Sequence, residues 1–113
     1  MTRPSKTADP PAHLSPEAAA WWRKVLGDFV FEAHHLKLLQ AACEAWDRCQ
    51  QAREQIATEG LTFNDKHGQP RAHPCVGIER DARIAFARLV RELVLDCEPP
   101  TEARPPRLAG ARA

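Results

Sequence analysis

Two histidines and a cysteine lie close together in the middle of the chain and could do metal chemistry. His67, His73 and Cys75 fall in a segment that also contains Pro70 and Pro74. Zinc sites close a tetrahedron with paired ligands at short, regular spacings, which this segment lacks. We therefore expect no metal and no cofactor. A metal-dependent nuclease that uses these three side chains is the alternative that the cluster leaves open.

The same segment offers one neighbouring pair that resembles a nucleophile and its base, Cys75 and His73. Nucleophilic catalysis also needs a group that orients the base. The carboxylates are scattered among basic residues on expected helix faces, and no glycine-rich phosphate loop is present. We therefore expect a protein that is not an enzyme.

Arginines recur at helical spacing in the expected last helix, residues 76–93. Apolar residues occupy one side of this helix, and the arginines occupy the opposite side. The arginines are Arg80, Arg83, Arg88 and Arg91. Such a face could contact phosphates or form ion pairs with a neighbouring subunit. It could also be an ordinary solvent-exposed face, with ion pairs inside the helix such as Glu79–Arg83. The terminal segments add the basic residues Lys6, Arg104 and Arg107, which we count with the four arginines as candidate contacts to DNA phosphates.

Three helices would position these residues, and the fold class is mainly α. Residues 33–58 contain no Pro or Gly and predict one long helix that Gly60 closes. A shorter helix begins with Ser15 as its N-cap and ends at Gly27. Its short link turns it back onto the long helix as a helical hairpin. Residues 61–74 predict a small β-hairpin or an extended loop before the last helix.

The composition predicts flexible ends around one packed domain. Residues 1–13 form a weakly basic arm, residues 14–97 the helical domain, and residues 98–113 a flexible tail rich in Pro and Arg. The N-terminal arm lacks the apolar core of a secretory signal, and no apolar run reaches the length of a membrane span. The four cysteines are therefore expected to be reduced and to pack as small apolar side chains.

A chain of 113 residues with a formal charge of +1 has a thin core and no large basic excess. Oligomerisation is a common remedy for a thin core. Trp21 and Trp22 point about 100° apart on a helix, so one fills the core and the other faces a neighbouring helix or subunit. The residues expected at the subunit interface are Trp22, Leu36, Leu39, Trp46, Ile56 and Phe63.

Three sequence features, in this order along the chain, resemble the phage terminase small-subunit family. The first is Leu14-Ser15-Pro16, which precedes a helix containing tryptophan. The second is a Leu-rich helix that carries Cys43 and Trp46. The third is the loop 68–74, which leads into a helix ending in Arg91-Glu92-Leu93.

The resemblance covers roughly residues 13–97 and implies a specific role. Proteins of this family are non-catalytic homo-oligomeric rings in the cytoplasm of the bacterial host. They bind double-stranded viral DNA and deliver it to the terminase large subunit, which holds the ATPase and the nuclease. A ring would also repeat a modest arginine patch many times, which offsets the low net charge. The alternatives are a small dimeric DNA-binding transcriptional regulator and a protein–protein adaptor without a nucleic-acid role.

Overall fold

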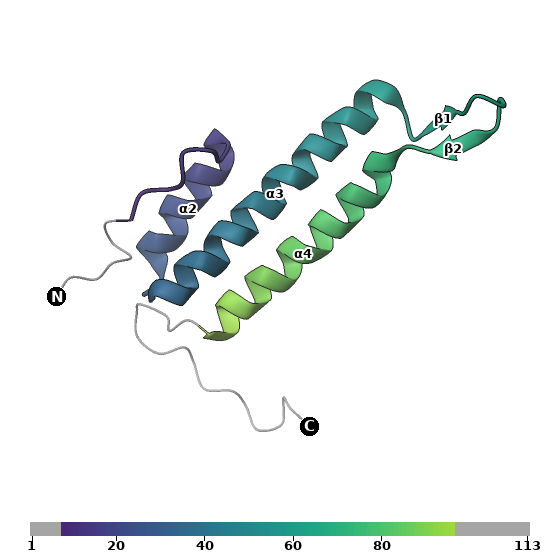
Figure 1. Cartoon of the computed structure of the whole chain (residues 1–113). Helices are drawn as coiled ribbons and strands as arrows, with labels where there is room; N and C mark the ends of the chain where they lie inside the picture. The colour runs from purple at the N-terminus through teal and green to yellow at the C-terminus, as the bar shows by residue number, and fades with distance from the viewer. Residues whose placement is uncertain (1–7, 97–113) are drawn as a thin grey trace, which may run out of the picture.

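The computed structural model describes residues 8–96, and within this range the chain forms three helices and one two-stranded sheet. The elements are α2 (Pro16–Asp28), α3 (Ala33–Glu59), β1 (Thr62–Asn64), β2 (Pro70–Ala72) and α4 (Pro74–Asp96). Figure 1 shows α3 between α2 and α4, with the β-hairpin projecting beyond the far ends of α3 and α4. The predicted helical class is confirmed. Residues 1–7 of the predicted arm and the whole predicted tail, residues 98–113, lie outside the described residues.

Helix α2 begins as the sequence predicts and ends one residue later than predicted. The Ser15 hydroxyl accepts a hydrogen bond from the Ala18 N–H, and Pro16 occupies the first turn. Gly27 does not stop the helix. The helix ends after Asp28, where Phe29 turns to an extended conformation while its N–H still bonds the Val25 carbonyl at 3.0 Å.

Helix α3 is the support on which the other two helices pack. Its 27 residues extend for about 40 Å at the usual rise per residue. Gly60 ends it with a φ of +94°, a conformation that side chains with a Cβ rarely adopt. The predicted hairpin of α2 and α3 is present. The more extensive contact, however, is a second hairpin of α3 and α4, which the two strands connect.

The core lies where α2 crosses the first half of α3 and the end of α4. Its members are Leu14, Ala18, Trp22, Leu26, Phe31, Leu39, Cys43 and Leu93. Trp22 is 4% exposed and Leu39 is fully buried inside the single chain. Within the single chain, these two predicted interface side chains therefore expose little or no surface to a neighbouring subunit.

Residues 8–13, which the sequence assigned to the flexible arm, contact the helical body. The indole N–H of Trp22 donates to the Ala8 carbonyl at 3.3 Å, and Ala8 packs against the core. His13 Nε2 lies 2.7 Å from a Glu44 carboxylate oxygen. A buried indole N–H requires an acceptor, and the backbone at Ala8 supplies it. The packed region thus starts earlier than residue 14.

The segment between α3 and α4 is a β-hairpin, one of the two predicted alternatives. Phe63 pairs with Arg71 in an antiparallel register. The Asp65 carboxylate organises the turn, since it accepts hydrogen bonds from the backbone N–H groups of His67 and Gln69 at 2.9 Å. Both strands are exposed along their whole length. A two-stranded hairpin with no packed face has little stability by itself.

None of the helices within residues 8–96 combines the length and the apolar character that a membrane crossing requires.

Candidate nucleic-acid interface

His73 fixes the start of α4 against the end of α3. Its Nδ1 accepts the N–H of Cys75 at 3.0 Å, so the proton of the neutral ring lies on Nε2. Nε2 is 2.6 Å from a carboxylate oxygen of Glu59 and donates to it. This hydrogen bond is the largest cause that holds the pKa of Glu59 below its usual value. His73 therefore acts as a helix cap and as a link between the two long helices.

The side chains of His67, His73 and Cys75, which the metal-dependent alternative would need together, do not converge. His67 lies in the turn at the tip of the hairpin, while His73 and Cys75 lie at its base. The two histidines are thus separated by the length of the strands. Within residues 8–96, no group of three or more His, Cys, Asp or Glu side chains is arranged to hold a metal ion.

The described cysteines are free thiols, as predicted. Cys43 is fully buried, and burial raises the pKa of its thiol to about 12. Burial also raises the pKa of Cys49, whose Sγ donates to Glu79 at 3.5 Å. Cys75 is half-buried. Cys97 lies outside the described residues.

Two of the four α4 arginines are engaged by carboxylates within the chain. Arg83 Nε donates to Glu79 at 3.3 Å, and Arg80 Nε donates to Asp81 at 3.3 Å. Glu79 also accepts from Arg53 of α3 at 3.1 Å. The hydrogen bond from Arg83 is the largest cause of the lowered pKa of Glu79. These pairs partly neutralise the first half of the arginine face.

The other two arginines, Arg88 and Arg91, are exposed on the second half of α4. Neither forms an ion pair within the part of the chain that the structure describes. Three residues apart on a helix, they extend from the same side. Their guanidinium groups are therefore available to an external anion. Arg88 also borders a shallow apolar depression that Ile84, Ala85 and Leu89 line.

The predicted interface residues outside the core differ in exposure. Leu36, Trp46 and Ile56 of α3 are half-buried, and Phe63 of the hairpin is 46% exposed. Trp46 packs against Phe86 of α4 with ring centroids 5.2 Å apart. Lys6, Arg104 and Arg107 lie outside the described residues, so their predicted DNA contacts have no structural description.

The sequence named Trp21 only as one of two divergent tryptophans and did not predict its contact with Phe86, which joins α2 to α4. Their ring centroids are 5.6 Å apart, and Phe86 lies between the two indoles of Trp21 and Trp46. Helical periodicity placed both residues on apolar stripes but carried no signal that the stripes meet. Trp21, not Trp22, is thus the tryptophan that faces a neighbouring helix.

Comparison with known protein families matches residues 18–105 to the family described as "Phage terminase, small subunit". No curated protein and no solved structure matches this chain. The matched segment covers most of the 113 residues and includes all three helices that the structure describes, except the first two residues of α2. The chain therefore belongs to the phage terminase small-subunit family. Membership supports a role in the packaging of phage DNA.

Proposed function

We propose that this protein assembles into a homo-oligomeric ring, binds double-stranded viral DNA and delivers it to the terminase large subunit. In this role it is the non-catalytic partner and acts in the cytoplasm of the bacterial host. The large subunit supplies the ATPase and the nuclease. Membership of the family supports the packaging role in general. The assembly, the DNA contact and the delivery are the proposal.

The observation that carries the DNA contact is the pair of unneutralised arginines on α4. Arg88 and Arg91 are exposed and lack an ion pair within residues 8–96, whereas Arg80 and Arg83 are partly neutralised. A guanidinium that is not held by a carboxylate costs less to transfer to a phosphate oxygen. We therefore rank Arg88 and Arg91 above Arg80 and Arg83 as phosphate contacts. Lys6, Arg104 and Arg107 remain proposed contacts from the tails.

Low net charge does not argue against this function if the chain assembles. Each copy carries a formal charge of +1, but a ring would repeat the Arg88–Arg91 pair in every subunit. Contacts to phosphates position DNA without reading its sequence. We therefore expect binding that depends strongly on salt and weakly on base sequence.

The double variant Arg88→Ala/Arg91→Ala should weaken binding to a duplex of mixed sequence by roughly tenfold in low salt. The plot of log affinity against log salt should become shallower by about 0.9 for each phosphate contact that is lost. Fluorescence anisotropy with labelled duplex at several salt concentrations measures both quantities.

The matched control is Lys37→Ala/Arg48→Ala, which removes two exposed positive charges from α3. This control should leave the salt slope nearly unchanged. An equal loss of DNA affinity in the two double variants would show that only net charge matters. Unchanged DNA affinity in Arg88→Ala/Arg91→Ala would remove the α4 face from the proposal.

A further inference from the structure

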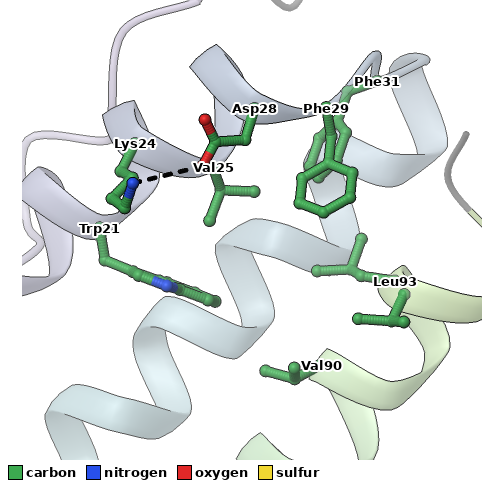
Figure 2. A pocket seen from close by; sticks show the side chains of 9 residues that line it. Trp21, Lys24, Val25, Asp28, Phe29, Phe31, Val90 and Leu93 are labelled. Atoms are coloured by element: carbon green, nitrogen blue, oxygen red, sulfur yellow. Dashed lines mark hydrogen bonds and ion pairs between the residues drawn. The ribbon is translucent and has the colours of Figure 1, made fainter. Parts of the chain in front are cut away.

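An apolar groove opens between the end of α2 and the end of α4. Its volume is about 230 Å³, and its walls are Trp21, Val25, Phe29, Phe31, Val90, Leu93 and Val94. Figure 2 shows Trp21 and Val25 facing Val90 across this space, with the two phenylalanine rings closing one end. Lys24 and Asp28, 3.4 Å apart at the rim, are the polar residues among its lining.

The groove results from the way α2 and α4 flank α3. The Trp21–Phe86 contact bridges the two outer helices at one level. Beyond that contact, towards the last turns of α2 and α4, no side chain of the described residues fills the gap. Val94 at the mouth is 60% exposed. An apolar surface of this kind gains free energy when a matching apolar group covers it.

A convex apolar feature projects from the opposite end of the molecule. Leu61 is 64% exposed and Phe63 is 46% exposed. Leu61 lies just before β1, but its carbonyl accepts the His73 N–H at 2.7 Å and extends the pairing by one position, so alternation places Leu61 on the same face as Phe63. Figure 1 shows that the hairpin extends past the ends of α3 and α4. Its apolar face therefore also lacks a covering group within residues 8–96.

The hairpin cannot reach the groove of its own chain. The hairpin follows the last turn of α3, whereas the groove lies beside the first turn of α3 and the last turns of α4. A helix of 27 residues, about 40 Å long, separates them. The groove has room for one or two large side chains and is too small for a whole helix. A side chain on a projecting turn of another copy fits these limits.

We propose that the hairpin of one subunit inserts Phe63, supported by Leu61, into the α2–α4 groove of the next subunit. The proposal rests on the self-assembly proposed above and names the contact that would produce it. Two different surfaces meet in such a contact, so the association is head-to-tail. Head-to-tail contacts between identical chains generate closed rings when the rotation closes. The same contact would cover the exposed face of an otherwise marginal hairpin.

Single variants at either side should abolish assembly without unfolding the chain. Phe63→Ala removes the inserted side chain from an exposed strand, and Val94→Lys places a charge at the exposed mouth of the groove. Each variant should elute as a monomer in light scattering on a sizing column, with an unchanged helical circular dichroism spectrum. The matched controls are Thr62→Ala on the same strand and Ile84→Lys, an α4 residue 40% exposed outside the groove. Both controls should assemble like the wild type.

A mixture of the two defective variants provides the sharper test. Phe63→Ala retains an intact groove, and Val94→Lys retains an intact hairpin. In a head-to-tail contact the two should form a 1:1 dimer and nothing larger. A two-fold symmetric interface would already give a dimer for the wild type, so a wild-type oligomer larger than this 1:1 dimer is the result that identifies head-to-tail assembly.

Failure of this contact and failure of the proposed function give different experimental results. A monomeric wild type would overturn both the contact and the ring. An oligomeric wild type with unchanged assembly in Phe63→Ala and Val94→Lys would overturn the contact alone. Loss of assembly in Ile84→Lys instead would assign the interface to the outer face of α4. An effect of Val94→Lys without one of Phe63→Ala would mean that a different segment fills the groove.

Discussion

At the scale of single residues, the start of α2 is held by a side chain that is distant in sequence. The Ser15 N–H donates to Asp47 at 2.8 Å, and the Ser15 hydroxyl donates to the same carboxylate at 2.5 Å. Sequence reasoning identified Ser15 as the N-cap from its type and its position before Pro16. It had no means of finding Asp47, because a contact across 32 residues leaves no local pattern.

Asp47→Ala should lower the free energy of unfolding by about 1–2 kcal/mol, because both Ser15 donors lose their acceptor. Urea unfolding followed by tryptophan fluorescence measures the change, at one fixed protein concentration because assembly adds to stability. Asp81→Ala is the control, since Asp81 is an exposed carboxylate whose pair with Arg80 contributes about 0–1 kcal/mol. Equal effects of the two substitutions would contradict the capping role.

The tryptophan pair shows the limit of periodicity at this scale. Trp21 and Trp22 both belong to an apolar stripe, and the sequence stated only that they diverge. Trp22 fills the core and Trp21 lies against Phe86. The choice depends on which side of α2 faces α3, and this is decided by long-range packing. For the same reason, the sequence included Trp22 and Leu39 in a subunit interface although both are buried within one chain.

At the scale of elements, the three helices and their order were predictable because each carries its own boundary signals. Gly60 closes α3 as predicted. Helix α4 was predicted over residues 76–93 but runs over Pro74–Asp96, because His73 caps its first turn and places Pro74 inside the helix. The hairpin was predicted only as one of two alternatives. Its formation depends on the Asp65 carboxylate, which bonds two backbone N–H groups and Arg71 Nε. The groove was not predictable, since it is a space between elements and no residue pattern records it.

The hydrogen bond between His73 and Glu59, which joins α4 to α3, should make the stability of the fold depend on pH. The hydrogen bond from His73 lowers the pKa of Glu59, and hydrogen bonds likewise lower the pKa of Asp65 and Glu79. A carboxyl group whose pKa is lower in the folded state than in the unfolded state stabilises the fold at pH values above its unfolded-state pKa. That stability is lost as pH falls through the folded-state pKa. Stability should therefore decline as pH falls below about 4.5, the ordinary pKa of Glu.

Glu59→Gln should make this decline shallower, because the residue at position 59 no longer binds a proton on unfolding. Urea midpoints between pH 7 and pH 3 measure the effect. Glu54→Gln, an exposed change on the same helix, should retain the decline of the wild type. An identical pH profile for Glu59→Gln and the wild type would show that the His73–Glu59 link adds no pH-dependent stability.

At the scale of the whole molecule, the chain has more apolar surface than a single copy covers. The groove at one end and the hairpin face at the other both lack a partner within residues 8–96. The sequence predicted the need for assembly from the short chain and the thin core. It did not predict where the contact lies, because the groove and the hairpin face become visible only when α2, α3 and α4 are packed. The same assembly would repeat Arg88 and Arg91, which form no ion pair within residues 8–96, in every subunit.

The native mass of the wild-type protein in solution tests the central proposal most directly. Light scattering on a sizing column should give a single species whose mass is a multiple of 12.6 kDa large enough for a closed ring. Such a species would support a ring-forming subunit of the packaging machinery. A dimer would favour a small DNA-binding regulator, and a monomer at micromolar concentration would contradict the ring.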